Sequence, residues 1–148
     1  MAKAKENKPK ITEKNKEQEV QQRYMEYQMM EQQLQQIQKQ LQQVQAQTTE
    51  LKRLGEAIGE FESIQTGKEV LVPFSPGVYA KAELKDTKTL LVNIGSNVVV
   101  SKSVKDTKEL IDNQIKEIEL TKRKLSQDMT AITLQAQILG QEINDLNQ

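Results

Sequence analysis

The chain has 148 residues, with 21 basic and 21 acidic side chains, no cysteine and no histidine. These absences exclude thiol nucleophiles, disulfides, the usual zinc sites and imidazole base chemistry, although metal-carboxylate and lysine chemistry remain formally open. The balanced charge gives no electrostatic footprint for nucleic acid, and the low hydrophobic fraction of 36% suits thin helices with one apolar stripe each better than a globule.

The N-terminal residues 1–16 are expected to form a disordered, charged tail, because Pro9 would interrupt a helix there. Asn15 and Gln18 have the spacing of a capping box, which predicts a helix that begins near residue 17 and ends near Thr66. Apolar residues then recur at steps that favour the heptad of a coiled coil. They are Val20, Tyr27, Met30, Leu34, Ile37, Leu41, Val44, Leu51 and Ile58.

Glutamine dominates this predicted helix between Gln18 and Gln47. A disordered, aggregation-prone tract is the alternative interpretation. The apolar heptad continues through the segment, however, and glutamine is a good helix former, so we favour a helix. Further on, Leu51 and Leu54 predict a slip of the heptad register around Gly55, with local overwinding of the coil.

The centre of the chain, residues 67–102, changes to an alternating pattern typical of strands. Turn signals at residues 75–77 (Ser-Pro-Gly) and 95–97 (Gly-Ser-Asn) predict two β-hairpins. Four short strands cannot bury both faces alone, and open edges invite pairing with other chains, so we expect oligomerisation here. The strand residues assigned to that contact are Val70, Val72, Val78, Leu84, Leu91, Ile94, Val98, Val99 and Val100.

A second helix is predicted over residues 103–148, opened by a capping box of Ser103 and Asp106. An apolar residue returns at every seventh position, while Lys108 and Lys122 interrupt the other core position. The repeating residues are Val104, Ile111, Ile118, Leu125, Ile132, Leu139 and Leu146. An antiparallel hairpin of the two helices would place Val20 beside Leu146.

Several apolar residues lie off both heptad seams, near the ends of the helices that are far from the predicted strands. They are Tyr24, Met25, Met29, Leu134 and Ile138. Scattered apolar residues on a surface are normal, but clustered ones are less expected, and methionine is favoured at promiscuous binding surfaces. We interpret the group as a binding surface. A plain coil-end contact with another subunit is the alternative.

The layout resembles the alpha-type subunits of the prefoldin family from residue 18 onward. The most specific segments are GKEVLVP at 67–73, GVYAKAEL at 77–84 and VNIGSNVVV at 92–100. Two hairpins, not one, mark the alpha class. The chain departs from the family at residues 74–76, where a Gly-rich turn is frequent. The implied fold is α+β, a long antiparallel two-helix coiled coil with two central β-hairpins that form an oligomeric β-barrel head.

The resemblance implies an ATP-independent molecular chaperone without cofactor. In that family two alpha-type and four beta-type subunits form a hexamer, whose coiled-coil tips hold unfolded client proteins and deliver them to a cytosolic group II chaperonin. We therefore expect a cytoplasmic protein with no nucleic-acid or membrane partner. No apolar run approaches the ~20 residues of a membrane span, and the N-terminus lacks the apolar core of a secretory signal.

A structural coiled-coil scaffold, or a filament-forming prefoldin relative, is the alternative function. It would require open-ended assembly through the predicted strands. An enzyme is disfavoured because no combination of nucleophile, base and orienting residue is found, and no Gly-rich phosphate motif occurs. No catalytic, cofactor-binding or metal-binding residue is therefore assigned.

Overall fold

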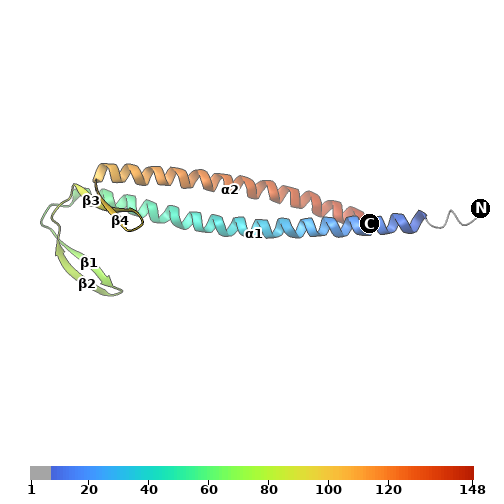
Figure 1. Ribbon diagram of the computed structural model, residues 1–148, viewed down its shortest axis with the longest axis horizontal. Helices are drawn as coiled ribbons and strands as arrows, with labels where there is room; N and C mark the ends of the chain where they lie inside the picture. Colours follow the sequence, from blue (N-terminus) through green and yellow to red (C-terminus); the bar gives the residue numbers. More distant parts are fainter. Residues whose placement is uncertain (1–7) are drawn as a thin grey trace, which may run out of the picture. The chain divides into compact units, whose positions relative to one another are not determined.

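The structure of the protein is a computed structural model that describes residues 8–148. In chain order it contains α1 (Lys8–Ser63), β1 (Glu69–Ser75), β2 (Val78–Glu83), β3 (Thr89–Gly95), β4 (Val98–Ser103) and α2 (Val104–Asn147) (Figure 1). The chain consists of two compact units. We call residues 45–120 the hairpin unit, and the described residues up to 44 together with 121–148 the terminal unit.

Helix α1 begins at Lys8, so the predicted start near residue 17 is wrong. Pro9 is the second residue of the helix, where its missing N–H is not needed and its fixed φ suits the first turn. The expected charged tail is thus helical from residue 8 onward, and residues 1–7 lie outside the described part of the chain. The helix ends at Ser63, three residues before the predicted end.

The buried stripe of α1 keeps one heptad register from Val20 to Ile58, so the predicted slip around Gly55 is also wrong. Around the predicted slip, Thr48 is buried and Gly55 half-buried at seam positions that lack an apolar residue, while Leu54 is exposed. The spacing between successive covered residues of α1 becomes a repeated three only after Ile58. The error arose because an apolar residue was assumed to mark the seam, whereas small residues fill it here.

Helix α2 begins as predicted, with the hydroxyl of Ser103 accepting a hydrogen bond from the N–H of Asp106 at 3.0 Å. This bond satisfies one of the free N–H groups of the first turn. Every residue of the predicted sevenfold repeat is buried or half-buried, and Val104, Ile111 and Leu139 are among the most buried side chains of α2. Ala136 and Ile143 are buried at the other core position. Lys108 and Lys122 are half-buried at the other core position.

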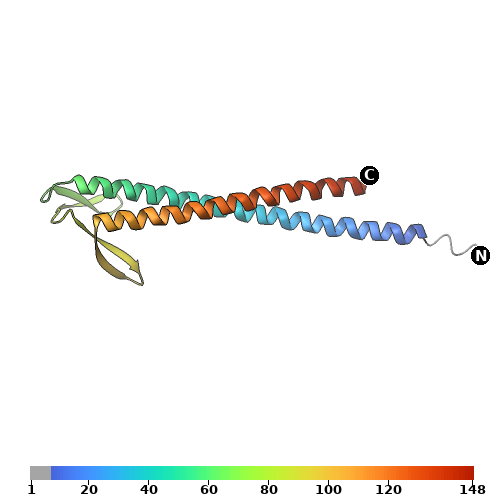
Figure 2. The same cartoon turned by 90° about the horizontal axis from the view of Figure 1, so that it is seen from above.

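The two β-hairpins form separate two-stranded antiparallel sheets, β1 with β2 and β3 with β4 (Figures 1 and 2). Gly77 turns the first hairpin with φ of +79°, a conformation that disfavours other residues. Ser96 and Asn97 turn the second hairpin, both with positive φ, as a two-residue turn between twisted strands requires. Both predicted turns are therefore present.

The core of the hairpin unit forms where the two helices meet. Ile58 of α1 packs with Val104 and Ile111 of α2, and Leu90 of β3 covers them. A backbone hydrogen bond of 2.9 Å from Val104 to Lys88 ties the start of α2 to the hairpins. This cluster attaches the second hairpin to the coil.

The helices pair antiparallel within each unit. In the hairpin unit Lys52 forms an ion pair with Glu119, and in the terminal unit Arg23 forms one with Glu142. The predicted fold class, two antiparallel helices with two central hairpins, is confirmed. The barrel is a property of an oligomer, because the hairpins of one chain remain two separate sheets.

Candidate functional site

The off-seam apolar residues of the terminal unit all lie at its surface. Their exposed fractions range from 53% to 60%. The group consists of Tyr24, Met25, Met29, Leu134 and Ile138. We call it the terminal apolar surface. Because none of these side chains is buried in the seam, none is needed to hold the two helices together.

The pairing of the helices places part of this surface on one flank. A Cβ added at Gly140 would lie 3.5 Å from the ring of Tyr27, so these two residues are at the same level. Since the helices run antiparallel, Met29 and Ile138 are also level with each other, two residues along each chain. Each of the two residues comes two positions after a seam residue of its own helix. In an antiparallel pair of helices this position lies on the same flank of both. The sequence alone did not show this juxtaposition.

A groove of about 350 Å³ lies on the same flank. Its floor contains Ile37 and Ile132, from the two seams. The other lining residues are Gln33, Gln36, Gln40, Asp128 and Ala131. No lysine or arginine lines it, so the groove itself presents apolar and amide groups with a single carboxylate. The glutamine-rich sequence thus forms part of the candidate surface, which sequence reasoning missed.

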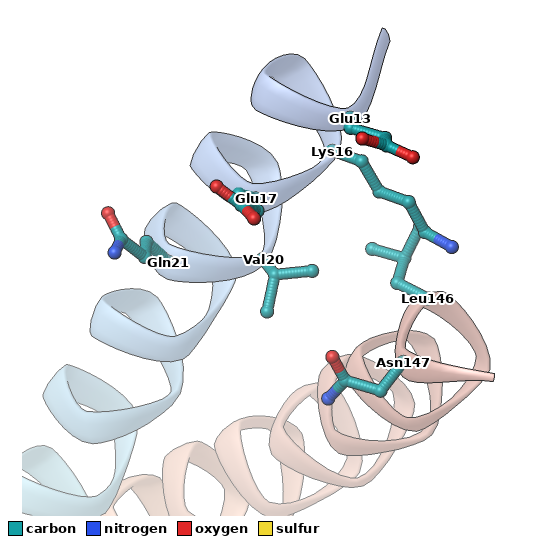
Figure 3. Close-up of a pocket in the computed structure, with 7 residues that line it drawn as sticks. All are labelled: Glu13, Lys16, Glu17, Val20, Gln21, Leu146 and Asn147. Carbon is teal, nitrogen blue, oxygen red and sulfur yellow. The ribbon is translucent and has the colours of Figure 1, made fainter. Parts of the chain in front are cut away.

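At the last turns of α2 the two helices line an opening, with Val20 beside Leu146 as predicted (Figure 3). Both apolar side chains reach into the space between the helices. Charged residues of α1, Glu13, Lys16 and Glu17, surround this opening. The predicted antiparallel register is therefore confirmed at this end of the coil.

Arg23 follows one turn later, at a seam position. Its guanidinium contacts Glu19 of the same helix at 3.0 Å and Glu142 of α2. The hydrogen bond with Glu19, and then the negative charge of Glu142, raise the pKa of Arg23 above its usual value. The seam therefore carries a compensated charge beside the terminal apolar surface.

The hairpins present the second candidate surface. Of the predicted contact residues, Val70, Leu84 and Val100 are half-buried within the chain. The other six are exposed: Val72, Val78, Leu91, Ile94, Val98 and Val99. Leu91 reaches 77% exposure. Apolar side chains this exposed, on sheets of two strands, are typical of a surface that another chain covers.

Sequence reasoning missed three further apolar residues of the first hairpin. Leu71, Phe74 and Tyr79 are exposed, and Phe74 reaches 81%. Leu71 pairs with Lys81 and Tyr79 with Pro73, so both belong to the face opposite Val72. Both faces of this hairpin therefore expose apolar groups.

The residues 8–148 contain no cluster of three acidic, histidine or cysteine side chains that could hold a metal ion. Within the same range, neither helix includes a stretch that is both long and apolar enough to span a bilayer.

Comparisons with known proteins agree with this architecture. The family model described as Prefoldin subunit matches residues 30–148. A relative from Archaeoglobus fulgidus, the prefoldin subunit alpha, is 33% identical over 94 residues, which cover 64% of this chain and 69% of the relative. A chain of the filamentous PFD of Methanocaldococcus jannaschii, solved by cryo-EM, superposes with a TM-score of 0.70 at 16% identity, covering 78% of this chain and 96% of that chain.

Proposed function

Because this chain belongs to the prefoldin family, and is therefore a chaperone-type subunit, we propose that it captures non-native proteins without ATP. The terminal apolar surface is the contact that binds them. The observation that carries this proposal is the exposure of Met25, Met29, Leu134 and Ile138 outside the seam. Such side chains can bind exposed apolar segments of an unfolded chain while the coil itself stays intact.

The composition of the surface suits clients of many sequences. Methionine side chains are flexible and polarisable, so they adapt to contacts of different shape. The neighbouring groove adds amides from Gln33, Gln36 and Gln40, which can both donate and accept hydrogen bonds. An unfolded segment exposes apolar side chains and unpaired backbone groups together. The apolar contacts and the amide hydrogen bonds therefore suit such a segment whatever its amino-acid sequence is.

The assembly that we propose is a hexamer of two copies of this alpha-type chain with four beta-type subunits. Its barrel would form from the hairpins, whose exposed Leu91, Val98 and Val99 would be covered by neighbouring strands. Several subunits holding one client multiply weak contacts through effective concentration, so affinity does not depend on a single deep pocket. Delivery to a group II chaperonin in the cytoplasm completes the proposal and rests on the family resemblance.

The prefoldin family consists of chaperones that are not enzymes, and we propose no catalytic activity or cofactor for this chain. The alternative is a scaffold or filament built by open-ended assembly of the hairpins. Native mass spectrometry, with and without a beta-type subunit, separates the two. A closed hexamer supports the chaperone assembly, whereas a ladder of increasing masses from this chain alone supports the filament.

The capture proposal is tested by replacing Met25, Met29, Leu134 and Ile138 together with serine. The readout is protection of a denatured client from aggregation by the assembled oligomer. Each residue removes apolar area worth roughly 1.5–3 kcal/mol if fully buried on binding, so protection should fall steeply. The matched control changes Leu54 and Leu120 to serine, since these are exposed off-seam leucines of the hairpin unit.

The control variant is expected to protect the client as the unchanged protein does. Circular dichroism and native mass must show that both variants remain helical and assembled. If the four-serine variant still protects fully, clients are held elsewhere, and the assignment of the terminal apolar surface is wrong.

A further inference from the structure

The methionines of the described chain fall into two environments. Met25 and Met29 each expose 60% of their surface, whereas Met30 and Met129 are half-buried at seam positions. Met25 and Met29 stand four residues apart in α1, so their thioethers share one helix face. The terminal unit therefore contains two exposed methionines and two half-buried methionines, which can be compared directly.

Accessibility controls how fast a thioether reacts with a dissolved oxidant. A methionine in the seam has neighbours from both helices, and the oxidant must displace them to reach the sulfur. At the outer positions of the heptad no opposing helix stands in the way. The chain has no cysteine, so no thiol competes for the oxidant within this protein.

We propose that Met25 and Met29 form a reversible oxidation site for hydrogen peroxide and related two-electron peroxides. The sulfur lone pair attacks one oxygen of the peroxide, and an S–O bond forms as the O–O bond breaks. The proton of the transferred oxygen passes to the departing oxygen, which leaves as water from hydrogen peroxide or as an alcohol from an organic hydroperoxide. Each thioether loses two electrons and becomes a sulfoxide, while one peroxide is reduced. A methionine sulfoxide reductase, with thiols as electron donors, returns the thioether.

The modification changes the terminal apolar surface without touching the seam. A sulfoxide is polar, so two of the flexible apolar contacts of this surface would become hydrated dipoles. The core positions Met30 and Met129 keep their packing, and the coil stays folded. This consequence rests on the proposed function. Oxidation would then lower client affinity in an intact oligomer, and reduction would restore it.

The test treats the assembled protein with increasing hydrogen peroxide and follows each methionine by peptide mass spectrometry. Sulfoxide is expected at Met25 and Met29 well before it appears at Met30 or Met129. In parallel, the concentration of assembled protein needed for half-maximal client protection is expected to rise roughly tenfold, because apolar contact area is lost. Methionine sulfoxide reductase should reverse both changes.

Two double variants make the assignment specific. The variant Met25→Leu with Met29→Leu should show no peroxide-dependent loss relative to its own untreated sample. The variant Met30→Leu with Met129→Leu should lose protection as the unchanged protein does. Equal oxidation rates at all four methionines, or equal peroxide losses in both variants, would overturn the proposal. If untreated protein never protects a client, the proposed function fails, while the mapped oxidation rates still decide whether the site exists.

Discussion

Arg23 of α1 and Glu142 of α2 form an ion pair at a point where the heptad seam would hold an apolar side chain. Glu19 holds the same guanidinium at 3.0 Å from within α1. The two carboxylates keep Arg23 charged and oriented while its stem covers the seam. A polar core position lowers stability but can define the register of a coil, so this pair helps to align the helices near Val20 and Leu146.

Replacing Arg23 with leucine is expected to raise the melting temperature. The exposed ion pairs contribute little, and an apolar side chain at a seam position gains burial. The control is Arg53→Leu, the same chemical change at an exposed position of α1, which should leave the melting temperature nearly unchanged. Thermal unfolding followed by circular dichroism measures both. A lower melting temperature for Arg23→Leu would show that the ion pair outweighs the apolar gain.

The seam is tested most directly at Ile111, which is 4% exposed and packs against Ile58. The change Ile111→Ala should lower the free energy of unfolding by roughly 2–5 kcal/mol, through lost burial and a cavity. Leu120→Ala removes the same kind of group from a side chain that is 62% exposed, and should cost no more than about 0.5 kcal/mol. Urea titration measures both, and similar values would refute the observed seam.

Two glycines should respond in opposite directions to alanine. A Cβ at Gly55 would stand 3.9 Å from Ile111, an ordinary contact within a helix, so Gly55→Ala should stabilise by about 1 kcal/mol through helix propensity. Gly67 has φ of +86°, where an L side chain is strained, so Gly67→Ala should destabilise by about 1–2 kcal/mol. Urea unfolding of the two variants checks the sign of each change.

A charge on the hairpin strands should block assembly. Val72→Lys and Val99→Lys each place an ammonium group on a strand that we expect another subunit to cover, and burying it unpaired costs several kcal/mol. Analytical sedimentation with a beta-type partner should show loss of the complex, with helix content unchanged. The change Leu120→Lys serves as a control on an exposed face of α2. Intact complexes with both strand variants would mean that the hairpins are not the interface.

The linker between the hairpins should loosen in acid. The hydroxyl of Thr89 donates a hydrogen bond to the carboxylate of Asp86, and the N–H of Lys88 donates a second one. The first bond has the larger effect, and both lower the pKa of that carboxyl below its ordinary 3.8. The stabilisation is present above pH 3.8 and is lost as the pH falls through the lower folded pKa. The protection of the Lys88 amide against hydrogen exchange, relative to its intrinsic rate at each pH, should fall in that range. An Asp86→Ala variant should show low protection at every pH, and protection equal to that of the unchanged protein would contradict the prediction.

Much of the candidate site could be recognised before any coordinates. The five residues of the terminal apolar surface were identified because they fall outside a heptad that the sequence displays plainly, and all five are exposed. The exposed Leu71 and Tyr79 were missed because a sequence does not reveal which face of a two-stranded hairpin remains bare. Binding of clients by these surfaces remains a prediction.

The sequence by itself determined the two helices, the two hairpin turns and the core positions of α2, because these depend on local periodicity and on residues such as Gly77 and Asn97 that adopt positive φ readily. Only the tertiary structure decided that Thr48 and Gly55 belong to the seam of α1, since the opposing helix, and not hydrophobicity, selects which side chains are covered. It also decided that Met29 and Ile138 share a level and a flank. That relationship depends on how two antiparallel helices align, and residues more than a hundred positions apart carry no local signal of it.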